Sequence, residues 1–146
     1  MYEGQGAGMA EGGGGLPDET VIVFDRDGVL YAYESFTQVT DDLEAIDVDE
    51  GEYPAVYSPD GGVLELTAPQ AWKGPVVLRR TGASDPGGLE AWVGRYWARY
   101  RVGEVPLGVE ETVRAVLAEE ADRGGAFGAL WGALTGALRR GVSRRF

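Results

Sequence analysis

Short runs of β-branched and aromatic residues alternate with turn residues in the first half of the chain. Two such runs, 21–24 and 29–33, flank the polar segment Asp25-Arg26-Asp27-Gly28. Aspartate side chains can accept hydrogen bonds from nearby backbone amides, and glycine adopts positive φ without a steric cost. The pattern therefore predicts a β-hairpin that turns over residues 25–28.

The same order of residues recurs about thirty positions later. In "YPAVYSPDGGVLELT" an aromatic residue again precedes a turn segment, Asp60-Gly61-Gly62, and a Val-Leu pair follows it. This repetition predicts a second hairpin of the same kind. The run "PVVLRR", residues 75–80, predicts one further strand. Its alternation places Val77 and Arg79 on one side and Val76, Leu78 and Arg80 on the other.

Helical spacing appears in three segments. In residues 35–47, Ser35 and Gln38 form a capping box, and four apolar residues lie on one face: Phe36, Val39, Leu43 and Ile46. In residues 85–100, Asp85 caps the helix and Pro86 takes its first position. The apolar residues of that helix recur every three or four positions: Leu89, Trp92, Val93, Tyr96, Trp97 and Tyr100.

The third segment, residues 109–123, has a narrower apolar stripe: Val109, Val113, Val116 and Leu117. Glu110 with Arg114 and Glu119 with Arg123 are predicted ion pairs along it. Together these patterns predict an α+β fold, in which a small, mostly antiparallel sheet of two β-hairpins plus one further strand is covered by about four helices. We expect a single domain over residues 20–125, preceded by a flexible glycine-rich arm, residues 1–19.

Composition restricts the chemistry. The chain of 146 residues contains no cysteine and no histidine, so thiolate catalysis and the commonest general base are absent. We therefore predict a non-catalytic protein without a cofactor or metal site, and a cytoplasmic location.

The net charge is −11, and it is unevenly distributed: residues 1–72 hold sixteen Asp and Glu against one base, whereas residues 73–146 hold twelve Lys and Arg against eight acids. Such an acidic surface disfavours nucleic acid as a partner.

One motif suggests an enzyme instead. The apolar run 21–24 followed by Asp25-Arg26-Asp27-Gly28 resembles the first motif of the haloacid-dehalogenase phosphatases. The resemblance implies that Asp25 is a nucleophile, that Asp27 is a general acid and base, and that a magnesium ion binds beside them. That family also requires a crossover helix after the motif and a strand that ends in paired acids after the lysine. Here a second strand follows at once, so the hairpin is the preferred interpretation.

The segment "DDLEAIDVDEGE" is the predicted partner-binding site. It carries seven acids and no base: Asp41, Asp42, Glu44, Asp47, Asp49, Glu50 and Glu52. The simplest interpretation is a solvated helix end, and weak divalent binding is another. The functional interpretation is a docking surface for a basic protein, which makes the chain an acidic inhibitor or immunity-type protein whose association is steered by charge.

The C-terminal segment, residues 126–146, repeats Gly-Ala-Leu with period four and ends in four arginines. It predicts a helix with a basic tail that packs on the domain, contacts another helix, or lies on an anionic membrane. The residues expected to make these contacts are Leu130, Trp131, Leu134, Leu138, Arg139, Arg140, Arg144 and Arg145. A peripheral membrane adaptor is therefore the alternative function, and the phosphatase is the third.

The aromatic residues of segment 85–100 are predicted to be core; any ring left exposed there would indicate a protein-binding hot spot rather than a base-stacking platform.

Overall fold

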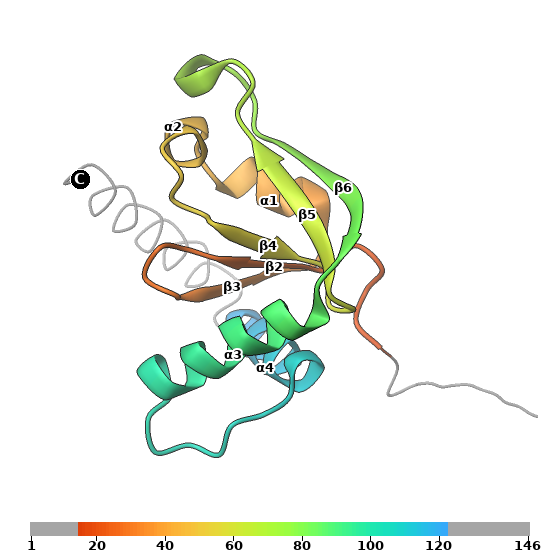
Figure 1. The fold of residues 1–146 in the computed structure, drawn as a ribbon, viewed down its shortest axis with the longest axis vertical. Coiled ribbons are helices and arrows are strands. Elements are labelled where there is room, and N and C mark those ends of the chain that lie inside the picture. The colour runs from red at the N-terminus through yellow and green to blue at the C-terminus, as the bar shows by residue number, and fades with distance from the viewer. Residues whose placement is uncertain (1–14, 123–146) are drawn as a thin grey trace, which may run out of the picture.

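The computed structural model, in which residues 15–122 are described, has the two predicted hairpins and one further strand in a single sheet (Figure 1). Its order is β3-β2-β4-β5-β6 and every pairing is antiparallel. The strands are β2 (Val21–Phe24), β3 (Leu30–Tyr33), β4 (Ala55–Tyr57), β5 (Gly62–Thr67) and β6 (Val77–Ser84). The predicted α+β class is confirmed.

The two hairpin turns have the same backbone geometry. In the first turn the amide of Asp25 donates to the carbonyl of Val29 over 3.2 Å, and the amide of Gly28 donates to the carbonyl of Asp25 over 3.0 Å. In the second turn, Ser58 donates to the carbonyl of Gly62 over 2.9 Å, and Gly61 donates to the carbonyl of Ser58 over 3.0 Å. Gly28 and Gly61 have φ values of 83° and 93°, which glycine adopts readily. The repeated sequence pattern therefore corresponds to two hairpin turns with the same hydrogen bonds.

Helices follow the predicted order, with one difference. They are α1 (Phe36–Asp42), α2 (Ala45–Asp49), the 3-10 turn η1 (Ala71–Lys73), α3 (Pro86–Tyr100) and α4 (Val109–Asp122). The single helix predicted over residues 35–47 is divided at Leu43, whose backbone is extended (φ −85°, ψ 138°). The side chain of Leu43 is buried in the core between the two helices, and α2 begins two residues later at Ala45.

Both predicted N-cap residues cap their helices, but the capping box predicted for Ser35 and Gln38 is only half formed. The Ser35 hydroxyl accepts the Gln38 amide over 3.2 Å, while the Gln38 side chain accepts the amide of Glu34 rather than that of Ser35. At α3 the Asp85 carboxylate accepts the Gly88 amide over 3.0 Å, and Pro86 takes the first helical position. Both caps satisfy backbone donors that have no partner inside the helix.

Each face of the sheet has its own hydrophobic core. Helices α3 and α4 cover one face, where Leu89, Val93 and Trp97 pack on Phe24 and Ile22. Helix α1 lies on the other face, where its Val39 packs with residues of β2, β4 and β5. Strand β6 is longer than the predicted run because it continues through Gly82, at φ 84°, to Ser84. In its first half Leu78 packs on the second core and Val77 is 39% exposed, which confirms the predicted alternation.

Candidate functional site

The carboxylate of Asp25 is fully engaged inside the first hairpin turn. Its side chain is 4% exposed. Oxygen Oδ1 accepts the amides of Asp27, over 2.9 Å, and Val29, over 3.0 Å, while Oδ2 accepts the hydroxyl of Tyr31 over 3.0 Å. These contacts fix the direction of the chain between β2 and β3. Asp25 therefore has the position and partners of a turn-forming residue.

Burial raises the pKa of Asp25 above its ordinary value, and the nearby charge of Asp27 raises it further. The three hydrogen bonds that the carboxylate accepts lower the pKa, but their effect is smaller than the net effect of the other two. The haloacid-dehalogenase resemblance implies a parallel sheet with a crossover helix after the motif. Within residues 15–122 all strand pairs are antiparallel, and β3 follows β2 directly. The fold implied by the resemblance is thus not found in the described residues.

Asp27 lies on the exposed side of the turn, and its backbone carbonyl accepts the hydroxyl of Tyr100 over 2.8 Å. This bond joins the end of α3 to the first turn. Across residues 15–122 no three acidic side chains are grouped so that they could hold a metal ion.

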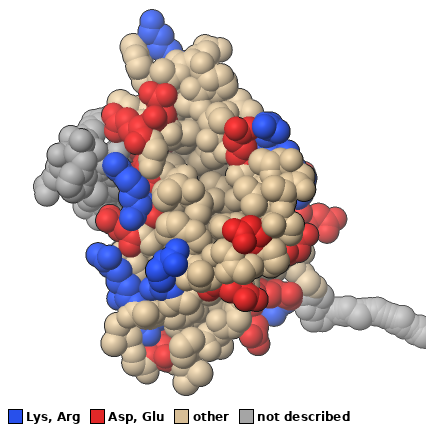
Figure 2. All heavy atoms as spheres, viewed as in Figure 1, with Lys and Arg blue, Asp and Glu red and all other residues tan. Residues whose placement is uncertain are grey.

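The seven acids of the predicted partner-binding site separate into exposed and buried groups. Asp41, Asp42, Asp49 and Glu50 are exposed and Glu44 is half-buried, whereas Asp47 and Glu52 are 2% and 5% exposed. Figure 2 shows acidic side chains gathered at the upper left of its view, over the region of α2. Five of the seven acids are therefore accessible to a partner, and we call these five the acidic surface.

Glu52 serves the fold. Its carboxylate accepts the guanidinium of Arg26 over 2.8 Å, and its carbonyl accepts the Arg26 amide over 2.9 Å. The single base of the first half of the chain therefore joins the segment after α2 to the first hairpin turn. Asp47 also lies inside, and its carbonyl accepts the amide of Glu52 over 3.0 Å. Neither carboxylate is placed to contact a partner directly.

The sequence did not single out Trp72, which is 66% exposed in η1 at the end of the β5–β6 hairpin. Ala71 beside it has φ 53°, in the left-handed region that alanine avoids. Helix α2 contacts η1, so the segment that carries this ring lies beside the helix that carries part of the acidic surface. A lone tryptophan between two predicted strands was the signal available in the sequence.

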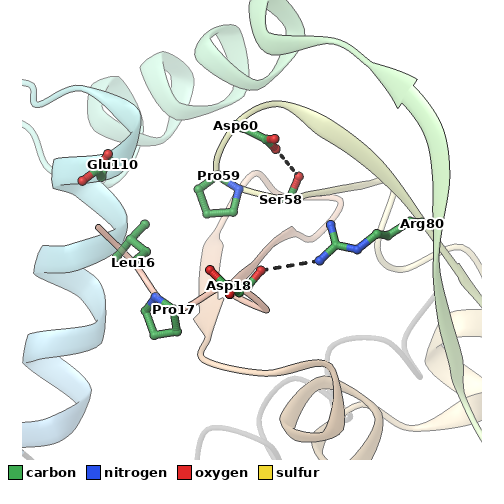
Figure 3. A pocket seen from close by; sticks show the side chains of 8 residues that line it. All are labelled: Leu16, Pro17, Asp18, Ser58, Pro59, Asp60, Arg80 and Glu110. Atoms are coloured by element: carbon green, nitrogen blue, oxygen red, sulfur yellow. Dashed lines mark hydrogen bonds between the residues drawn. The ribbon is translucent and has the colours of Figure 1, made fainter. Parts of the chain in front are cut away.

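A small hollow of about 200 Å³ lies between the N-terminal segment, the second hairpin turn, β6 and α4 (Figure 3). Three acids line it, Asp18, Asp60 and Glu110, together with a single base, Arg80. The Ser58 hydroxyl donates to Asp60 over 2.5 Å and lowers the pKa of that carboxyl. The hollow is wide open to solvent and its polar groups bond to one another, so it has the character of a surface depression.

The predicted contacts of the C-terminal helix, Leu130 to Arg145, lie outside the described residues and stay a prediction. Among residues 15–122 no helix has the length and apolar character needed to cross a bilayer. Comparison of the chain with protein-family models, with curated proteins and with solved structures gave no match. The function is therefore argued from the surface of the domain itself.

Proposed function

We propose that this protein is a non-catalytic protein-interaction module that binds a basic protein through its acidic surface. The observation that supports this most directly is the exposure of four acids on the consecutive helices α1 and α2 and at the C-terminal cap of α2: Asp41, Asp42, Asp49 and Glu50. No basic residue occurs between positions 41 and 52 to neutralise them. A basic surface would therefore meet a concentration of acidic side chains there.

Charge of this kind acts mainly on the rate of association. A concentrated negative patch on a chain with net charge −11 attracts a positive partner from beyond contact distance and speeds productive encounter. Such steering weakens as salt shortens the screening length to about 8 Å at physiological ionic strength. The specific version of the proposal is an inhibitor or immunity-type protein that covers a basic active site on its target.

The short-range part of the interface is supplied by Trp72. An exposed tryptophan near the acidic surface provides a large apolar side chain that a partner can bury, and tryptophan is among the residues that dominate binding energy at protein interfaces. In this arrangement the acids accelerate encounter, and the ring slows dissociation.

The test begins with capture of a partner by the intact tagged chain at low and moderate salt, and then measures association and dissociation rates with the isolated partner. The double variant Asp41→Asn/Asp49→Asn is compared with Glu90→Gln/Asp122→Asn, which changes the net charge equally at exposed positions outside the acidic surface. We expect the first pair to slow association and reduce its salt dependence. Equal rates for the two pairs would place the docking site elsewhere.

A further inference from the structure

Two arginines on α3 are exceptional in this acidic molecule. Among residues 15–122 the other arginines all bond to the protein: Arg26 to Glu52, Arg79 to Glu65, Arg80 to the Asp18 carbonyl, Arg101 to Glu104 and Glu119, and Arg114 to Glu110. Arg95 and Arg99 are exposed and, in this part of the chain, have no acidic partner within ion-pair distance.

Both guanidinium groups lie on aromatic rings. That of Arg95 is 4.6 Å from the ring centroid of Trp92, and that of Arg99 is 5.6 Å from the ring of Tyr100. A guanidinium is attracted to the face of an aromatic ring and can still direct its N–H donors outward. Stacking therefore orders the two side chains without consuming their hydrogen-bonding capacity.

The rings themselves are fixed by the fold. Trp92 packs on Phe24 with ring centroids 5.1 Å apart, and Tyr100 donates its hydroxyl to the carbonyl of Asp27 over 2.8 Å. Holding a binding group before the ligand arrives reduces the entropy lost on association. Figure 2 shows basic side chains gathered at the lower left of its view, in the region that α3 occupies in Figure 1.

We propose that Trp92, Arg95, Arg99 and Tyr100, which we call the α3 arginine surface, bind an acidic peptide segment of a second partner protein. Arginines one turn apart have Cβ atoms about 5–6 Å apart. Side chains at positions i and i+2 of an extended strand point to the same side and are about 6.6 Å apart. An extended segment with Asp or Glu at alternate positions can therefore present one carboxylate to each arginine.

A peptide segment fits this surface better than nucleic acid does. A long polyanion is repelled by the net charge of −11, whereas two carboxylates on a short segment meet mainly the local field of the arginines. Arg, Trp and Tyr are also the side chains enriched at protein-binding hot spots. This site is separate from the acidic surface and has the opposite charge, so the module would bind two different partners.

The test uses calorimetric titration of the intact protein with a short, unstructured peptide that carries Glu at alternate positions, and with the same peptide carrying Gln. The variant Arg95→Gln/Arg99→Gln is compared with Arg79→Gln/Arg114→Gln, which makes the same charge change at exposed arginines elsewhere. We expect the intact protein and the control variant to bind the Glu peptide at least about tenfold more tightly than the Gln peptide. The Arg95/Arg99 variant should lose that preference.

Three outcomes would overturn the proposal: no binding at about 1 mM Glu peptide, equal binding of the two peptides, or unchanged preference in the Arg95/Arg99 variant. Tighter binding of a single-stranded oligonucleotide than of the Glu peptide would assign the surface to nucleic acid instead. The Asp41→Asn/Asp49→Asn variant should bind the Glu peptide at least as well as the intact protein does. Failure of the acidic surface and failure of the α3 arginine surface are therefore measured separately.

Discussion

The indole N–H of Trp97 donates a hydrogen bond of 2.9 Å to the hydroxyl of Thr112, and this bond links α3 to α4 inside the first core. The hydroxyl in turn donates to the carbonyl of Gly108 over 2.7 Å. Trp97 and Thr112 are 4% and 1% exposed. Because water cannot replace either partner at this depth, the pair fixes how the two helices lie against each other.

Replacing Thr112 by Val preserves the shape of the side chain and leaves the indole N–H without an acceptor. We expect the free energy of unfolding to fall by about 1–3 kcal/mol, as measured by urea denaturation. Thr112→Ser retains the hydroxyl and deletes one buried methyl group, so its cost should be about 1 kcal/mol. Unchanged stability of Thr112→Val would mean that the hydroxyl contributes nothing beyond packing.

The two equivalent turn glycines should respond differently to alanine. A Cβ at Gly28 would meet nothing within 4 Å, so Gly28→Ala should cost only about 1–2 kcal/mol for its positive φ. A Cβ at Gly61 would lie 2.6 Å from the Cα of Pro86, a backbone atom that cannot rotate away. We expect Gly61→Ala to cost at least about 1–3 kcal/mol more than Gly28→Ala in denaturant unfolding.

If the two glycine variants were equally stable, the second turn would have room to move away from the start of α3. Thermal unfolding of each variant, followed by the tryptophan fluorescence, would report that adjustment, because Trp92 lies about two turns after Pro86 on the same helix.

The raised pKa of Asp25 predicts a pH dependence. Its folded pKa lies above the ordinary value of 3.8, so the folded state binds the proton more tightly than the unfolded state does. Ionised Asp25 therefore destabilises the fold at neutral pH, and the penalty disappears as the pH falls through the raised pKa towards 3.8. Asp25→Asn cannot titrate, so the stability of the natural protein relative to this variant should increase over that interval.

The measurement is urea denaturation of both proteins at neutral pH and near pH 4, where the common titration of the other acids cancels in the comparison. A difference in stability that is independent of pH would show that Asp25 has the same pKa in both states. A relative loss of stability on acidification would indicate a pKa lowered by the hydrogen bonds of the turn.

Arg101 joins the end of α3 to α4 through Glu119, with Nη2 and Oε2 2.8 Å apart. Glu119 is 43% exposed, so solvent screens the pair and we expect a coupling of only about 1 kcal/mol. A double-mutant cycle with Arg101→Gln and Glu119→Gln measures it, and the coupling should decrease in 1 M salt. A coupling that does not respond to salt would point to packing of Arg101 on Trp97, which lies 5.1 Å away.

Ion pairs illustrate where sequence reasoning succeeds. Glu110 and Arg114, four residues apart on one helix, were predicted to pair and do so. Glu119 was predicted to pair with Arg123, which lies outside the described residues, and among residues 15–122 it bonds to Arg101. The second pairing depends on the approach of two helices, and no local spacing encodes it.

The two hairpins, the start of α3 and the apolar stripes could be predicted from the sequence, because turns, caps and helical periodicity depend on neighbours within a few positions. The break at Leu43, the burial of Asp47 and Glu52, and the bond from Arg26 to Glu52 depend instead on contacts between distant segments. The tertiary structure also placed Arg95 and Arg99 on aromatic rings, where neither forms an ion pair with an acid of residues 15–122. Each of these depends on which distant segments the sheet order brings together, and only the folded chain supplies that order.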